Sequence, residues 1–249
     1  MRKNRNRPES DEPLSEGRVE YLEAARQRVR NRRIRRTAVL LVLLTAVVLF
    51  ATGIAGSSVA ALKDLTDTAR IALLPGSGWP QQTGVMEPTR VLPMTGGFVE
   101  LDSEDVVVYS AYGAKVRSFQ PGYARPVMAV GGTHFVVYNR AGSELTVCSR
   151  TRTLYTQRFD EDILLCAMSN NNSLAVVTDA DRFAGWVHIY DPSMRELYSW
   201  RMPQSMGTPI ALDFAPDNRR FASGMIAARD GQLNCSVYFM SLDSDTEGL

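Results

Sequence analysis

Histidine and cysteine are scarce in this chain, and their scarcity excludes several kinds of chemical site. There are two histidines, His134 and His188, and three cysteines with no Cys-x-x-Cys pair among them. A zinc site needs several such ligands at matched spacing, and a histidine base needs a nucleophile that no motif supplies. Both histidines lie inside apolar runs (HFVVY and WVHIY), which favours structural roles. We therefore expect no catalytic residue, no cofactor, no cofactor-binding residue and no metal ligand.

The three cysteines are Cys148, Cys166 and Cys235, and each falls within a predicted strand. Their odd number and their apolar neighbours predict buried free thiols that act as small apolar side chains. The alternative is a single disulfide, which an exported domain would permit.

Charge is absent from Thr37 to Leu62, a run of about 26 residues that is long enough to cross a bilayer core of ~30 Å with some tilt. A cleaved signal peptide is the competing interpretation, because Ser57-Ser58-Val59-Ala60 resembles a cleavage site. The run is longer than a signal-peptide core and the basic region before it is unusually long, so we predict an uncleaved transmembrane helix over 37–62. Small residues within the run also suggest helix pairing, and hence a homo-oligomer.

The basic head, residues 1–36, sets the predicted orientation. Only Lys63 and Arg70 follow the apolar run closely. The residues directly before it that we assign to membrane orientation are Arg30, Arg32, Arg33, Arg35 and Arg36. Basic flanks stay in the cytoplasm, so we predict a single-pass protein of the cell membrane with its C-terminal domain extracytoplasmic. The head either contacts the lipid bilayer or serves only as an orientation signal. Nucleic-acid binding is not expected, since no aromatic platform accompanies the arginines.

Residues 63–93 are predicted to form a connector. A short helix is predicted from Asp64 to Leu74, and the segment that follows is rich in proline and glycine, which sustain neither helix nor central strand. This segment either spaces the exported domain from the membrane or wraps its first face, with Trp79 packed on that domain.

Residues 94–249 change to short runs rich in Val, Ile, Tyr and Phe, separated by turn clusters such as Asn170-Asn171-Asn172 and Pro216-Asp217-Asn218. This pattern predicts an all-β domain. The predicted strands are Phe98–Asp102, Val106–Ser110, Lys115–Phe119, Pro126–Val130, His134–Asn139, Glu144–Ser149, Thr153–Arg158, Ile163–Ser169, Ser173–Asp179, Trp186–Asp191, Glu196–Arg201, Pro209–Phe214, Arg220–Ile226 and Asn234–Ser241.

A repeat underlies these strands. VVVYSAYGAKVRSF, LTVCSRTRTLYTQR and VHIYDPSMRELYSW each join an apolar strand, a polar turn and a second strand, and VYFMSLDSD repeats the first half. The fourth positions of these units, Tyr109, Cys148, Tyr190 and Met240, are 39, 42 and 50 residues apart. Four-stranded propeller blades have a period of about 40–50 residues. The repeat predicts a β-propeller of about four blades, WD40-like or quinoprotein-like.

The Arg-rich head, the membrane span, Gly78-Trp79-Pro80 and segments such as HFVVYNRAGSELTV and IALDFAPDNRRFASG together resemble a known family. It is a membrane-anchored, propeller-like family of Gram-positive-type bacteria, a domain of unknown function, which implies no catalytic residues. A ring closes without exposed edges only when it is complete, so we expect either a small ring or a chain truncated after Leu249, and favour truncation.

Two acidic turns, two glycine pairs and four aromatic residues are further candidates for functional sites. Asp179-Ala180-Asp181 and Asp160-Glu161-Asp162 are interpreted as polar turns, and Gly96-Gly97 and Gly131-Gly132 lack the helix of a phosphate loop. The aromatic residues line either a glycan or peptide groove or the core: Trp186, Tyr190, Tyr198 and Trp200.

The hypothesis favoured by the sequence is a non-enzymatic, membrane-anchored scaffold or binding domain for a cell-envelope protein or wall component. The alternative is a cell-envelope enzyme acting on glycans through carboxylates at blade tips.

The predicted topology is tested by adding protease to intact, wall-stripped cells. We expect digestion of the domain after Pro93, because that domain would lie outside the membrane. Protection of the domain would contradict the orientation.

Overall fold

The computed structural model describes residues 55–83, 85 and 87–242. The chain divides into two compact units, 1–58 and 59–249. Almost all of the first unit lies outside the described residues, as do residues 37–54 of the predicted transmembrane helix and the five orientation arginines. No helix within the described residues is long and apolar enough to span a membrane.

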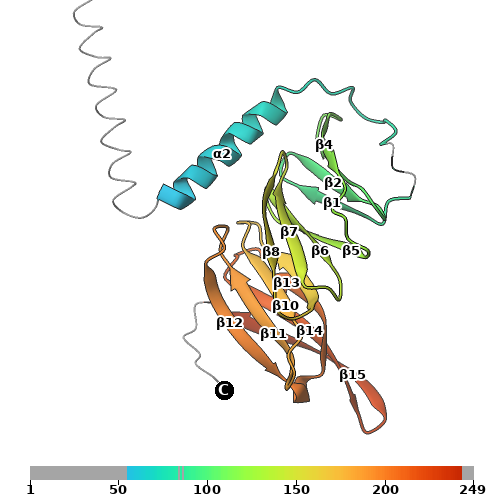
Figure 1. The fold of residues 1–249 in the computed structure, drawn as a ribbon, viewed down its shortest axis with the longest axis vertical. Helices are drawn as coiled ribbons and strands as arrows, with labels where there is room; N and C mark the ends of the chain where they lie inside the picture. The colour runs from blue at the N-terminus through green and yellow to red at the C-terminus, as the bar shows by residue number, and fades with distance from the viewer. Residues whose placement is uncertain (1–54, 84, 86, 243–249) are drawn as a thin grey trace, which may run out of the picture. The chain divides into compact units, whose positions relative to one another are not determined.

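Four antiparallel sheets form the second unit, and they follow one another along the chain (Figure 1). Sheet 1 contains β1 (Arg90–Met94), β2 (Gly97–Leu101), β3 (Val106–Ser110) and β4 (Lys115–Phe119). Sheet 2 contains β5 (Pro126–Val130), β6 (His134–Asn139), β7 (Glu144–Ser149) and β8 (Thr153–Arg158). Sheet 3 contains β9 (Ile163–Met168), β10 (Leu174–Thr178), β11 (Phe183–Tyr190) and β12 (Glu196–Pro203), and a short 3₁₀ turn, η1 (Gln204–Met206), follows it. Sheet 4 contains β13 (Thr208–Phe214), β14 (Arg220–Arg229) and β15 (Gln232–Ser241).

Each sheet is a simple meander in which every strand pairs with the next along the chain. All fourteen predicted strands occur, with ends shifted by a few residues in β11, β14 and β15. One strand, β1, was not predicted and lies in the segment read as connector. It contains Pro93, the last residue of the predicted connector. Since β1 pairs only with β2 within the described residues, its other edge has no strand partner there, and a proline that lacks a backbone N–H is tolerated on such an edge.

The middle strands are buried on both faces, which explains their continuous apolar runs. In β6, Phe135 and Val137 point into a core shared with sheet 1, whereas Val136 and Tyr138 point into a core shared with sheet 3. In β10 the alternation repeats, because Val176 faces sheet 2 and Val177 faces sheet 4. Successive side chains of a strand point to opposite faces. The sheets therefore pack face to face in chain order, with one core between each adjacent pair.

The first strand of each sheet is its innermost strand, and the turns after these strands are joined by hydrogen bonds. The Thr95 amide donates to the Gly132 carbonyl (2.8 Å). The amides of Thr133 and His134 both donate to Asn172 Oδ1 (2.8 and 3.0 Å). The Asn171 amide donates to Asn218 Oδ1 (3.2 Å). We call this end of the domain the turn end.

Close approach at the turn end requires glycine. A Cβ on Gly132 would lie 2.3 Å from the Asn170 carbonyl oxygen, and one on Gly131 would lie 2.5 Å from that of Ser169. The Gly131-Gly132 pair is thus a packing feature between sheets 2 and 3, in agreement with the expectation that it is no phosphate loop.

The connector covers the outer face of sheet 1, as one of its two interpretations predicted. The Trp79 ring packs on Phe98 and Tyr109, with ring centroids 5.3 and 5.9 Å away. Its Nε1 donates to the Ala111 carbonyl (3.0 Å), and the Gly78 amide donates to the Tyr112 carbonyl (3.1 Å). The outer face of sheet 1 is therefore shielded from water by the chain's own connector.

Helix α2 (Ala55–Ala72) extends into the first part of the connector and is attached to the turn end. It begins before the predicted start at Asp64. Asp64, Asp67, Thr68 and Ile71 are spaced three and four residues apart and so share one helix face. Asp67 forms an ion pair with Arg152 (2.8 Å), and Asp64 contacts His134 Nε2 (3.2 Å). Ile71 and Asp67 are buried by this contact.

The hydrogen bonds between the turns are best tested by removing the side-chain amide of Asn172. Asn172 adopts a φ of 67°, which glycine tolerates, so N172G removes the side-chain bonds without backbone strain. We expect N172G to lower the free energy of unfolding by about 1–3 kcal/mol, since it leaves two amides without their acceptor.

Chemical denaturation of the purified full chain measures this change. The matched control is N170A, whose exposed side chain has no hydrogen bond within the described residues and should change stability by less than about 0.5 kcal/mol. Equal stability of N172G and the unaltered chain would contradict the role of these bonds.

Candidate functional site

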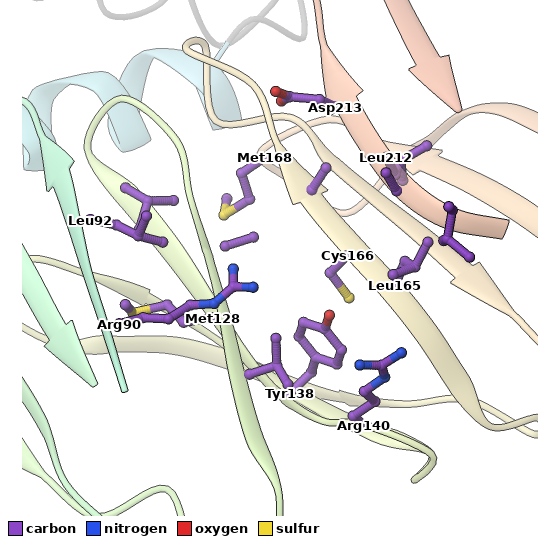
Figure 2. A pocket seen from close by; sticks show the side chains of 16 residues that line it. Arg90, Leu92, Met128, Tyr138, Arg140, Leu165, Cys166, Met168, Leu212 and Asp213 are labelled. Carbon is purple, nitrogen blue, oxygen red and sulfur yellow. The ribbon is translucent and has the colours of Figure 1, made fainter. Parts of the chain in front are cut away.

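The inner strands of the four sheets enclose a cavity of about 430 Å³ (Figure 2). Its walls are β1, β5, β9 and β13, together with the end of β6. The polar side chains among its lining residues are Arg90, Tyr138, Arg140, Cys166 and Asp213. A concave site with few convergent polar groups is the usual form of a small-ligand site.

The two arginines lie at the end of the cavity opposite to the turn end. Arg90 is the first residue of β1, and Arg140 directly follows β6, where its amide donates to the Arg125 carbonyl (3.2 Å). Asp213 lies near the other end of its strand, and Figure 2 shows it well away from Arg140. The charged groups of the cavity are therefore separated by sign along its length.

Tyr138 stands between the two arginines in Figure 2. It is only 3% exposed. Burial raises the pKa of its hydroxyl to about 12, despite the opposing effect of Arg140 and Arg90. The hydroxyl therefore keeps its proton at neutral pH and is available as a donor.

A second, smaller pocket of about 250 Å³ lies at one end of sheet 3. Glu161, Asp179 and Asp181 line it, so the fold brings the two predicted acidic turns together. Arg201 covers the Trp186 ring from 4.3 Å in this pocket. Among the described residues, no group of three or more His, Cys, Asp or Glu side chains has the geometry to hold a metal ion.

The four aromatic residues that could have lined a glycan or peptide groove lie on opposite faces of sheet 3. Trp186 and Tyr190 share one face with His188, whose ring is 4.4 Å from Trp186 and 6.1 Å from Tyr190. Tyr198 and Trp200 instead pack into the core between sheets 3 and 4. They do not form a single groove.

The two histidines each contact a carboxylate. His134 is buried and reaches Asp64 of α2, and His188 Nδ1 lies 3.0 Å from Glu196. His134 therefore helps to hold α2 on the turn end, which is a structural task.

Arg150 is the most buried cation of the described residues. It is 3% exposed, and its guanidinium donates to the Thr95 carbonyl (2.9 Å) and to Thr68 Oγ1 (2.5 Å). Burial lowers its pKa, an effect opposed by Asp64 and Asp67. Arg150 thus links α2 to sheets 1 and 2 at a single point.

Sheet 4 exposes apolar side chains. Leu233, Val237 and Phe239 of β15 are 74%, 59% and 81% exposed, and they alternate with residues that pack inward, such as Tyr238 and Met240. Ile210 of β13 adds a further half-exposed side chain. We call Ile210, Leu233, Val237 and Phe239 the open face of sheet 4.

Residues 81–247 match a family described as a family of unknown function (DUF5711). The chain belongs to the DUF5711 family. This confirms the expected resemblance to a domain of unknown function. No curated protein matches the chain.

Solved structures similar to this DUF5711 chain are β-propellers. A complex of KlAtg21 with the coiled coil of AgAtg16 is 10% identical, with 66% of this chain and 54% of that chain covered and a TM-score of 0.51. The Neurospora crassa Pan2 WD40 domain is 14% identical, with 62% and 48% covered and a TM-score of 0.44. BamB from Moraxella catarrhalis is 14% identical, with 54% and 42% covered and a TM-score of 0.41.

The chain spans about half the length of these solved structures. At such identities the likeness concerns the fold alone. The four meandering sheets agree with the predicted mainly β, propeller-like architecture.

The accessibility of the cysteines tests whether β15, which carries the open face, is exposed to solvent. All three are free. Cys148 is buried as predicted, Cys166 is only partly buried because it lines the central cavity, and Cys235 is exposed, so the prediction of burial was wrong for Cys235. Cys235 belongs to β15, in register with Ile226. Burial raises the thiol pKa of Cys148 and, well above its ordinary value, that of Cys166.

We expect a maleimide to label Cys235 rapidly in the folded chain and the buried Cys148 only after unfolding. A raised thiol pKa leaves less of the reactive thiolate at neutral pH, and burial blocks access. Mass spectrometry of labelled peptides measures the rates, and C235S should remove the fast reaction. Fast labelling of Cys148 in the folded chain would contradict the packing described.

Proposed function

We propose that this chain is a non-enzymatic binding module, anchored in the cell membrane through residues 37–62, whose extracytoplasmic sheets bind an envelope protein through the open face of sheet 4. The observation that carries the proposal is the exposure of Leu233, Val237 and Phe239 on one face of β15. Large contiguous apolar patches are rare on monomeric proteins and mark interaction sites.

The open face is suited to a flat, apolar partner. Opposite Val237 and Phe239 in the strand register lie Gly224 and Ala222 of β14, whose small size leaves the surface shallow. A flat surface with few projecting side chains accepts another sheet or an extended segment more readily than a globular knob.

The edge of β15 supplies a second attraction. Within the described residues β15 pairs only with β14, so the backbone groups along its other edge have no strand partner. An exposed strand edge is a template for an added strand, and main-chain hydrogen bonds then contribute to affinity. We therefore assign to the partner an extended, apolar segment that pairs with β15 and covers Val237 and Phe239.

The attachment of α2 suits this role in a membrane-anchored protein. The helix begins at Ala55, within the predicted span, continues beyond it, and is held at the turn end by Asp64, Asp67 and Thr68. The sheets would thus be joined to the predicted anchor through a helix that they themselves hold.

The alternative hypothesis, an enzyme acting on glycans, has one observation in its favour. Glu161, Asp179 and Asp181 line the same small pocket as Phe183 and Trp186, and paired carboxylates are the usual catalytic groups of glycosidases. A glycan-cleaving activity lost in both D179N and D181N would favour this alternative.

The binding hypothesis is tested by replacing single residues with a photo-cross-linking amino acid in cells that naturally produce the protein. At position 239 we expect a discrete adduct with one envelope protein, because Phe239 is 81% exposed on the open face. Position 183 is the matched control, since Phe183 is also an exposed aromatic residue but belongs to sheet 3.

Substitution V237S should reduce the yield of the adduct from position 239 by about tenfold, which corresponds to a loss of about 1.4 kcal/mol in binding. Identical adducts from positions 183 and 239, or none from position 239, would contradict the proposal. Adducts between two copies of the chain would identify the partner as a second copy of this chain and not as an envelope protein.

A further inference from the structure

The arginine end of the central cavity has a surplus of positive charge that the fold itself does not use. Neither the Arg90 nor the Arg140 guanidinium has a hydrogen bond or ion pair among the described residues. Other arginines of the domain do have carboxylate partners: Arg152 pairs with Asp67, Arg195 with Asp191 and Arg220 with Asp217. The two cavity arginines are distinguished from these by their position on the cavity wall.

The two side chains come from different sheets and line the same end of the cavity. Arg90 starts β1 in sheet 1, whereas Arg140 ends β6 in sheet 2. Both act electrostatically on the Tyr138 hydroxyl, and Figure 2 shows that hydroxyl between their guanidinium groups. Two like charges held near one buried hydroxyl repel each other, and an anion between them would remove that repulsion.

Tyr138 is held in place to serve as a neutral donor at this point. Its ring packs in the core between sheets 2 and 3, and only 3% of the residue is exposed. Since the raised pKa keeps the phenol protonated, its O–H remains available to an incoming acceptor. The site therefore offers donors on two guanidinium groups and one hydroxyl.

The only carboxylate among the cavity-lining residues is Asp213, and it does not neutralise the arginines. It lies on β13, and its Oδ1 accepts a hydrogen bond from the Phe214 amide (2.8 Å). An anion at the arginine end would be drawn towards the cations and kept from the inner end of the cavity.

We propose that the arginine end of the central cavity binds a phosphate group, held by Arg90 and Arg140 with the Tyr138 hydroxyl as a third donor. Guanidinium groups match phosphate in shape and charge, and two of them balance a dianion. The cavity, at about 430 Å³, is larger than a phosphate ion, so the group is either free phosphate or the phosphate of a small monoester. This inference is independent of the open face of sheet 4.

The experiment is a calorimetric titration of the purified full chain with inorganic phosphate at constant ionic strength. We expect saturable binding, weakened at least about tenfold in both R90Q and R140Q, because each loses a charge-assisted pair. The matched control is R125Q, because Arg125 is an exposed arginine whose carbonyl accepts the Arg140 amide but which does not line the cavity. Its affinity should stay within about twofold of the unaltered chain.

Two further arms complete the test. D213N should bind phosphate at least as tightly as the unaltered chain, since it removes the only cavity carboxylate. Phenyl phosphate that binds more tightly than inorganic phosphate would assign the site to a monoester, and equal affinities would assign it to the free ion. The proposal is overturned if phosphate does not bind saturably, or if R90Q and R140Q bind it as well as R125Q does while all three variants remain folded by circular dichroism.

Discussion

Face-to-face packing of β-sheets is the interaction on which the rest of this structure depends. Each sheet is apolar on both faces, and each interior face is covered by the next sheet along the chain. Burial of apolar surface stabilises such a stack by about 25 cal/mol per Å². A stack of this kind, however, leaves one face at each end that no further sheet covers. These two faces differ in their exposure to water.

At the first end the chain covers itself. Trp79 closes over Phe98 and Tyr109, and its Nε1 donates a hydrogen bond to the Ala111 carbonyl between β3 and β4. At the other end, sheet 4 keeps Leu233, Val237 and Phe239 in contact with water. The contrast gives the domain one closed end and one end that can associate, which is the physical basis of the proposed binding role.

The inner strands depend on the same packing. Because the sheets meet along β1, β5, β9 and β13, the space between these strands becomes the central cavity, and side chains of these strands become its lining. Arg90 and Arg140 are distant in the sequence, and they line the same cavity only because sheets 1 and 2 pack together. The attachment of α2 at the turn end leaves the arginine end free of that helix.

Much of the fold was predictable because local pattern and burial agree. The strands β6 and β10 are covered on both faces, so their sequences HFVVYN and LAVVT are continuously apolar and easily recognised. The turn residues Asn172 and Asn218 were also correctly placed, since asparagine tolerates the positive φ found there. In contrast, β1 was missed because Pro93 is acceptable only on a strand edge, and edges are decided by pairing rather than by sequence.

The candidate sites were harder to predict because they join distant segments. Asp64 and Asp67 have the spacing of one helix face, but their partners lie 70 and 85 residues later, His134 at the start of β6 and Arg152 in the turn between β7 and β8. Likewise, Arg90 and Arg140 look like ordinary solvated charges at strand ends. The open face was hidden in the alternation of β15, because Tyr238 and Met240, which flank Phe239, do belong to a core.

The central claim is that sheets 1 to 4 form a continuous stack whose last sheet is open. Hydrogen–deuterium exchange of the purified full chain, resolved to single strands, tests this claim most directly. The account predicts slow exchange in β6 and β10, which are covered on both faces, and markedly faster exchange in β15, which has a free edge and an exposed face. Exchange in β15 as slow as that in β10 would show that its edge and face are covered, and would contradict the account.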